Sequence, residues 1–162
     1  MDDVRAVLDA AGSDQAAVFA QGYGCPIAVV FAATHPERTR ALILYSAMAK
    51  AGLKTDDYPW GSTPAEAEAW RTESGERWGS EEFATEWLRR LAPSAAGDPR
   101  QIAWYARVMR AAATPTASQR FSEMNALMDV RALLPVLHVP TLILERKDVL
   151  APKAGVDVRS LE

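Results

Sequence analysis

The apolar positions of the chain follow two different periodicities. Continuous short apolar runs are typical of parallel strands that are covered on both faces. Three such runs occur, at residues 16–20, 41–45 and 141–144. A parallel strand pair needs a crossover connection, and the stretch between the first two runs has helical spacing. The first two runs therefore predict a strand–helix–strand unit.

Helix-ending residues set the limits of the helices around these runs. Asp2 and Asp3 suit the start of a helix and Gly12 suits its end, which predicts a helix over about residues 3–11. Pro26 fits the first turn of a second helix and Pro36 stops it. A further short helix is expected at 130–134, before the third apolar run.

Between about residues 47 and 128 the strand-like runs disappear and helix starts recur. Thr63, Ser80 and Asp98 are the expected N-caps of three helices. A last helix is expected at 117–128, with Phe121, Met124 and Met128 as its apolar stripe. The segment is predicted to be helical throughout.

All five tryptophans lie in this helical segment, between residues 60 and 104. Most of them are expected to form the core between its helices. Trp60, which stands between Pro59 and Gly61, is the candidate for a residue that lines an apolar ligand pocket.

Strand-forming segments on both sides of a long helical stretch predict an α/β fold with an insertion. Residues 1–46 and 129–162 are expected to form one sheet core of about three parallel strands, and residues 47–128 an inserted helical cap. A length of 162 residues allows a single compact domain of this kind.

Composition and charge exclude several functions. A net charge of −3 with no basic stripe argues against nucleic acid, and no apolar run is long enough for a membrane span. The two histidines have no carboxylate or cysteine at ligand spacing, so neither a metal nor another cofactor is expected. Cys25 is the single cysteine, and no signal peptide is recognisable, so we expect a cytoplasmic protein.

The stretch 18–26 carries the main chemical signal, because a sharp turn from a strand into a helix presents one residue above a sheet. With PERTRALILYSA after this helix, DYPWG in the helical segment and DVRALLPVLHVPTLIL before the last strand, the sequence resembles the α/β-hydrolase family. It is especially similar to the hydrolase-type domains found alone or fused to nucleotide cyclases in actinobacteria.

The resemblance implies a G-x-S-x-G elbow whose serine attacks the substrate. Its five positions correspond to residues 20–24, and the nucleophile position is Gly22, which has no attacking atom. The Tyr23 N–H remains available to hold an anionic or carbonyl group, with Gly24 and Cys25 beside it. The family's acid corresponds to Asp148, whose alternative role is that of a loop-capping residue.

The resemblance also implies a catalytic histidine after the acid, and no histidine follows Asp148. His35 beside Pro36, and His138 before the last strand, are interpreted as surface or capping residues. Cys25 offers a rival nucleophile at a helix start, although no base is evident and a buried, inert thiol is the alternative. Gly22-x-Gly24 is only weakly similar to a dinucleotide-binding loop, because Ile27 stands at the third glycine position.

Two functions are compatible with these features. The first is a truncated hydrolase by descent, acting on ester or amide substrates with a degenerate site and little or no activity. The second is a non-catalytic module that binds a small apolar ligand or a partner protein through the cap pocket. Because three strands leave unpaired edges, we also expect a homo-oligomer formed through an exposed sheet edge or the cap helices.

Overall fold

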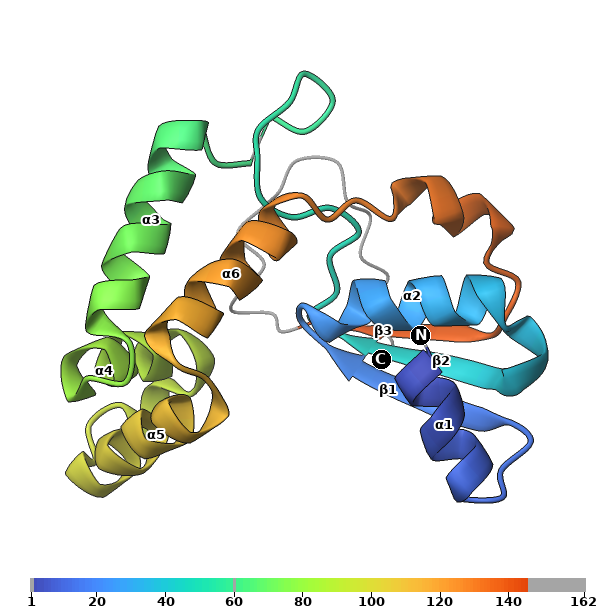
Figure 1. Ribbon diagram of the computed structural model, residues 1–162, viewed down its shortest axis with the longest axis horizontal. Coiled ribbons are helices and arrows are strands. Elements are labelled where there is room, and N and C mark those ends of the chain that lie inside the picture. Colours follow the sequence, from blue (N-terminus) through green and yellow to red (C-terminus); the bar gives the residue numbers. More distant parts are fainter. Residues whose placement is uncertain (1, 60, 146–162) are drawn as a thin grey trace. The chain divides into compact units, whose positions relative to one another are not determined.

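The computed structural model describes residues 2–59 and 61–145, so Trp60 and Asp148 lie outside the described residues. The chain forms two compact units (Figure 1). The sheet unit comprises the chain up to Ala51 and from Met128 onward, and the helical unit is Gly52–Leu127. We expected the boundaries between the two units at residues 46/47 and 128/129. Ala47 and Ala49 instead pack against the core of the sheet unit, so the first boundary comes later in the chain.

The sheet unit contains three parallel strands in the order β1-β2-β3. Its elements are α1 (Asp2–Ala10), β1 (Ala16–Gln21), α2 (Gly24–Thr34), η1 (Pro36–Arg38), β2 (Thr39–Tyr45), η3 (Arg131–Val136) and β3 (Thr141–Leu144). These bounds confirm the predicted strands and first two helices to within a few residues. The short helix expected at 130–134 is a 3-10 helix with Pro135 inside it.

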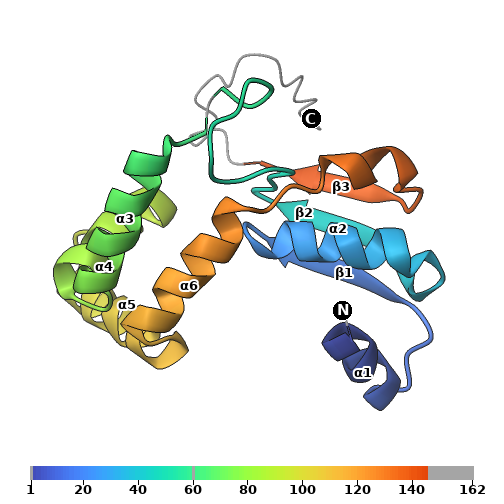
Figure 2. The same cartoon turned by 45° about the horizontal axis from the view of Figure 1, so that its top comes forward.

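Helix α2 lies along one face of the sheet (Figure 2). Because strand side chains alternate between faces, every second residue of β1 and β2 points towards this helix. The side chains of Ala20, Leu42 and Leu44 form a core with apolar residues of α2 and Val130. The helix is apolar almost all round, and it buries Cys25, Pro26, Ala28, Val29, Phe31 and Ala32.

Among the residues that the structure describes, the strands are not covered on both faces, so this prediction is wrong for that part of the chain. Phe19 of β1 is 61% exposed, and all four residues of β3 are exposed. The physical reason is that, in the described part of the chain, α2 is the helix that packs on the sheet, and it covers β1 and β2 from one side. Helix α1 has no buried residue, so its apolar side chains do not close the opposite side.

The helical unit has four α-helices whose starts are set by the expected kind of cap. They are α3 (Pro64–Arg77), α4 (Glu81–Leu91), α5 (Pro99–Ala112) and α6 (Pro115–Ala126), with the 3-10 helix η2 (Pro93–Ala95) between α4 and α5. Thr63 and Glu66 form a reciprocal capping box at α3. Ser80 accepts the Phe83 N–H, and Asp98 accepts the Arg100 N–H.

The aromatic core of the helical unit is centred on Phe83, which is 1% exposed. Its ring lies 5.9 Å from that of Trp70 and 6.3 Å from those of Trp78 and Trp87. The Trp78 Nε1 donates to Met109 O at 3.0 Å and to Ala113 O at 2.9 Å, so its polar end is satisfied. These three tryptophans form the expected core, whereas Trp104 is 52% exposed.

Helix α6 differs from its prediction in position and in the face that it buries. It begins two residues earlier than expected because Thr114 caps it and Pro115 occupies its first turn. The expected apolar stripe is exposed at Phe121 and Met124, and the buried positions are the polar Ser118 and Asn125. This helix packs against α3, where Gln119 fits against Gly75, so close approach decides which face is buried.

In the described part of the chain, every helix is too short or too polar to cross a bilayer.

Candidate functional site

The turn between β1 and α2 has the geometry of an elbow. Gly22 has φ +53°, a left-handed conformation that glycine adopts without strain. Its N–H donates to Tyr45 O at 2.9 Å, and its carbonyl accepts the Cys25 N–H at 3.0 Å. A Cβ built on Gly22 meets no atom within 4 Å. The space at the Cβ position of Gly22 is therefore open, while two hydrogen bonds hold its backbone.

The strand register brings three strand ends to one level at the carboxyl edge of the sheet. Gln21 pairs with Tyr45, and Tyr45 pairs with Leu144. The next residues along the three strands are Gly22, Ser46 and Glu145. Because neighbouring strands are about 4.8 Å apart, the Gly22 and Glu145 backbones lie roughly 10 Å from each other.

Ser46 and Glu145 are site residues that the sequence did not reveal. Ser46 has φ +50° and is the non-glycine residue with a positive φ among those described, a conformation that costs energy and is enriched at functional sites. The Glu145 carboxylate accepts the Ala47 N–H at 3.0 Å, which fixes an acid at the end of β3. Neither residue belongs to a local motif, because only the strand register brings them beside the elbow.

Comparison with known proteins gives matches in structure and none in sequence. No protein-family model matches the chain, and neither does any of the curated proteins. An esterase from Exiguobacterium antarcticum matches with a TM-score of 0.65 and 21% identity, over 87% of this chain and 52% of that one. A bromoperoxidase from Bacillus anthracis matches with a TM-score of 0.69 and 18% identity, over 88% of this chain and 53% of that one. An α/β-hydrolase enzyme from a Medee basin deep-sea metagenome library matches with a TM-score of 0.59 and 18% identity, over 88% of this chain and 50% of that one.

The chain has a partial α/β-hydrolase fold. Three parallel strands carry a helical insertion between β2 and β3, and the chain spans about half the length of each of the structures that it matches. At these identities the likeness concerns the fold. The resemblance inferred from the sequence is thus confirmed at the level of architecture, and the expected elbow lies at the carboxyl edge of its sheet.

The turn residue with a positive φ is Gly22, which has no side chain and therefore no attacking atom. Tyr23 is the N-cap of α2, and its N–H lies at the positive end of the helix. The backbone can hold a carbonyl or anionic oxygen there, but it cannot form a covalent intermediate.

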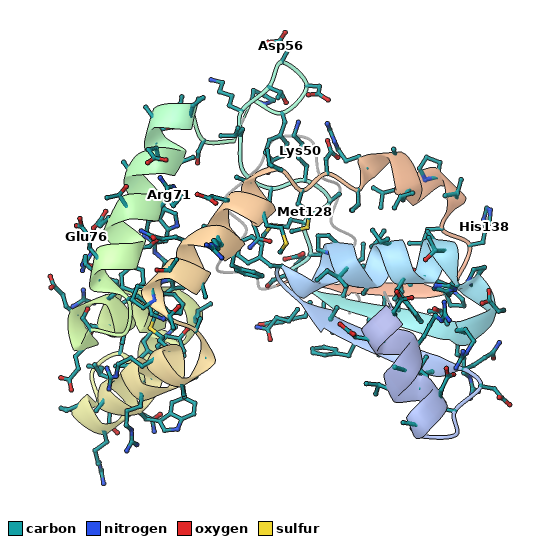
Figure 3. The ribbon with its side chains drawn as sticks, viewed as in Figure 1. Lys50, Asp56, Arg71, Glu76, Met128 and His138 are labelled. Atoms are coloured by element: carbon teal, nitrogen blue, oxygen red, sulfur yellow. The ribbon has the colours of Figure 1, made fainter. Side chains whose placement is uncertain are left out.

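Both histidines of the chain lie at the opposite edge of this sheet. His35 follows the last residue of α2, an 11-residue helix about 16 Å long, whereas the elbow precedes its first residue. His138 precedes β3 and lies at the far end of the sheet unit from Lys50 and Met128, as Figure 3 shows. Lys50 follows the carboxyl end of β2, so His138 is at the amino edge. Neither imidazole is within proton-transfer distance of Gly22.

Cys25 is placed in the core rather than in the open part of the elbow. It is 1% exposed, and its Sγ donates to Tyr45 O at 3.6 Å. Burial raises the pKa of the Cys25 thiol, and the Glu145 carboxylate adds to this shift. The neutral thiol is therefore favoured, which opposes the reactive thiolate considered from the sequence.

An apolar cleft of about 340 Å³ lies beside the elbow. Its lining comes from α1, β1 and α2: Val4, Val18, Phe19, Ala20, Gln21, Gly24, Ile27, Ala28 and Phe31. A polar cavity of about 490 Å³ lies at the amino edge instead, near Asp9 and Arg38. There the Arg38 side chain donates to Asp14 O, to Ser13 O and to Asp9 Oδ1, so it holds the loops together. The cleft is thus the cavity that adjoins the candidate site.

Proposed function

We propose that this chain is a hydrolase-like protein without a hydrolytic activity of its own. Its fold is that of enzymes that cleave ester or amide bonds, and its elbow keeps the shape that such enzymes use. The observation that carries the proposal is Gly22, which stands in the elbow with φ +53° and open space above it. Without a side chain at this position, acyl transfer through the elbow has no nucleophile.

Within residues 2–59 and 61–145, no histidine adjoins the elbow to serve as a base. A serine-type nucleophile needs a base within about 3 Å, and both imidazoles are at the amino edge of the sheet. The Glu145 carboxylate accepts the Ala47 N–H at 3.0 Å, and the Glu145 and Gly22 backbones are roughly 10 Å apart. The expected acid, Asp148, lies outside the described residues.

A panel of short-chain nitrophenyl esters tests this proposal. We expect the wild-type chain to hydrolyse them no faster than buffer does, and Gly22→Ser alone to give no turnover because no base is near. With added imidazole as a substitute base, Gly22→Ser should react with a fluorophosphonate at the introduced serine. Gly12→Ser is the matched control, because Gly12 also has a positive φ of 62° and an open Cβ position.

The proposal would be contradicted if the wild-type chain hydrolysed the esters with saturable kinetics and if Gly22→Ser, but not Gly12→Ser, changed this turnover. Failure of Gly22→Ser to react even with imidazole would show that the elbow has lost its oxyanion-binding geometry as well as its nucleophile. In that case the loss of function involves more than the residue at position 22. Circular dichroism on each variant separates these results from unfolding.

A second candidate is binding of a small apolar ligand without turnover, and the cleft beside the elbow favours it. Ile27 lines this cleft and is 45% exposed. We expect the fluorophore 1-anilinonaphthalene-8-sulfonate to bind saturably and Ile27→Asp to weaken that binding. Val7→Asp is the matched control, because Val7 is 68% exposed on α1 and is not part of the lining. Equal loss of binding in both variants would exclude the cleft as the site.

A further inference from the structure

The charges of the helical unit are separated along the chain. Residues 56–86 contain nine acids and two arginines, a net charge of −7, whereas residues 87–122 contain six arginines and one acid, a net charge of +5. The whole-chain charge of −3 conceals this separation. Helix α5 belongs to the basic stretch. A surface beside α5 experiences this local charge, because salt screens charges that are more than about 8 Å away.

The arginines of the two stretches also differ in their partners. In the acidic stretch, Arg77 makes ion pairs with three glutamates at 2.6 to 3.5 Å. Arg100 of α5 has a 94% exposed side chain, and its ion pair in the described part of the chain joins its Nε to Asp98 Oδ1 at 3.8 Å. Arg107 has no hydrogen bond or ion pair with any residue that the structure describes. These two arginines of α5 are therefore accessible to an anion outside the chain.

The side of α5 that carries these arginines faces away from α4. Ala106 and Met109, the buried residues of α5, pack with Phe83 and Ala84 of α4. With 3.6 residues per turn, the opposite side of the helix carries five exposed residues. We call this surface the α5 outer face; it consists of Arg100, Trp104, Arg107, Val108 and Ala111. Trp104 is 52% exposed, so a large aromatic side chain stands in solvent one helical turn from each of two arginines.

The α5 outer face combines an apolar stripe with a cationic border. Trp104, Val108 and Ala111 follow one another at spacings of four and three residues, so they form one stripe along the helix. Arg100 and Arg107 both lie on the same side of that stripe. Tryptophan prefers the boundary between lipid and water, and arginine can lay its aliphatic stem along apolar groups while its charge stays in water. Helices that rest on bilayers present this combination of side chains.

Charge and size decide which kind of partner fits the α5 outer face. Cover by further polypeptide of the same fold would remove Arg100 and Arg107 from water, which is costly unless each meets an acid. The face is about 21 Å long and about 10 Å wide, roughly 200 Å², which is well below the ~800 Å² that each partner contributes to a specific protein interface. A lipid surface requires no matching shape, and its attraction adds up over individual cations and apolar groups. A lipid surface therefore fits this face better than a protein does.

We propose that the α5 outer face docks this protein reversibly on a lipid bilayer that carries anionic headgroups. Trp104 and Val108 enter the headgroup layer, and the guanidinium groups of Arg100 and Arg107 bind lipid phosphates. The contact is superficial, so it needs no helix that crosses the bilayer. Because few groups take part and the whole chain is acidic, binding should be weak, and it should require both anionic lipid and low salt.

Co-sedimentation of the full chain with lipid vesicles tests the proposal. We expect binding to vesicles made of equal amounts of phosphatidylglycerol and phosphatidylcholine at an ionic strength of about 0.1 M, and loss of that binding at about 1 M. Vesicles of phosphatidylcholine alone should bind no measurable fraction of the chain. Arg100→Gln combined with Arg107→Gln should raise the dissociation constant about 25-fold, because each arginine near an anionic membrane contributes about fivefold.

The matched control removes two arginines from the sheet unit. Arg5→Gln combined with Arg40→Gln gives the same net charge, and both residues are exposed. This control should change the dissociation constant less than about twofold. The proposal is overturned if the wild-type chain does not bind the anionic vesicles, if it binds both kinds of vesicle equally, or if the two double variants weaken binding equally. It is also overturned if the chain self-associates without lipid through Arg100 and Arg107, since the face would then serve a protein contact.

Fluorescence quenching by brominated lipid gives an independent measurement that does not depend on the arginine variants. Bromine atoms on the acyl chains quench a tryptophan that enters the bilayer. We expect anionic vesicles with brominated chains to quench the wild-type emission, and Trp104→Phe to lose most of this quenching. Trp87→Phe is the matched control, because Trp87 packs in the aromatic core and its Nε1 has no hydrogen-bond partner among the described residues. Equal quenching of the two variants would contradict a contact through the α5 outer face.

Discussion

The helical unit surrounds its aromatic cluster on its own, whereas the sheet unit covers one side of its sheet. Phe83 is 1% exposed among three tryptophans and the helices α4 and α5, while Phe19 is 61% exposed on β1. Both are phenylalanines in regular secondary structure. The difference comes from the number of elements available to pack on them.

This contrast shows that a unit can have regular secondary structure without burying all of its large apolar side chains. Each of the described α-helices of the helical unit begins at a side-chain cap and packs on at least one other helix of that unit. The sheet has a parallel register with one irregularity, between Ala16 and Ala17, yet Phe19, Leu142 and Ile143 are exposed on it.

Truncation of the two phenylalanines gives the largest expected difference between the units. Phe83→Ala should lower the free energy of unfolding of the helical unit by about 3–5 kcal/mol, because it leaves a cavity in a packed core. Phe19→Ala should change the stability of the monomeric chain by less than about 0.5 kcal/mol, because little burial is lost. Urea unfolding at low protein concentration measures both. All tryptophans lie between residues 60 and 104, so their fluorescence reports on the helical unit, and far-ultraviolet circular dichroism follows the whole chain.

A large loss of stability in Phe19→Ala at a concentration where the chain is monomeric would break this comparison. It would mean that other polypeptide of the same chain already covers the Phe19 side chain. A loss that appears only at high protein concentration would sharpen the comparison, because association would then be the source of the burial.

The elbow gives the next largest expected effect. Gly22→Ala should cost about 1–2 kcal/mol of unfolding free energy, because a Cβ disfavours the left-handed backbone that the turn requires. Gly97→Ala is the matched control: its Cβ position is also open, but its φ is not in the left-handed region. That substitution should be neutral or slightly stabilising. Equal effects of the two changes on the urea midpoint would show that the turn is not rigidly held.

Signals confined to a few neighbouring residues predicted the fold well. The caps at Thr63, Ser80 and Asp98 lie where the sequence placed them, because a cap depends on a side chain and an N–H two or three residues away. The apolar runs also predicted the strands correctly. The Gly22 turn and its place at a carboxyl edge followed from the same kind of local pattern and a family resemblance.

Burial and the composition of the site depend on distant residues and were predicted poorly. An apolar run is compatible with cover on both faces, but the described chain supplies one covering helix, so β3 is exposed. The apolar stripe of α6 was expected inside, yet Ser118 and Asn125 are the buried positions. Ser46 and Glu145 stand beside the elbow through strand register alone. No pattern within either segment marks them.

The cap of α4 gives a smaller effect, confined to the helical unit. Ser80→Ala removes the acceptor of the Phe83 N–H, a 3.1 Å hydrogen bond, and should cost about 1 kcal/mol of unfolding free energy. Thr85→Ala in the same helix is the control, because its hydroxyl bonds only to the Glu81 carbonyl within the helix. It should shift the stability by less than about 0.5 kcal/mol. A larger effect at Thr85 in tryptophan-monitored unfolding would argue against the cap as the main determinant of this helix.

The smallest expected effect is electrostatic and belongs to the sheet unit. The Arg131 side chain hydrogen-bonds to Asp129, and with the Arg131 N–H and the positive charges of Arg131 and Lys50 it lowers the pKa of that carboxyl from 3.8 to about 2. A depressed folded-state pKa stabilises the protein above the unfolded value, so this contribution is present above pH 3.8 and is lost as the pH falls towards about 2. The pair is partly exposed, so the effect should be small and weaker in high salt. Asp129→Asn should therefore be less stable than the wild type near neutral pH and equal to it at the acidic limit. The urea midpoints of the two proteins could instead differ by the same amount from neutral pH down to about pH 2. That result would show that the charge of Asp129 does not stabilise the sheet unit.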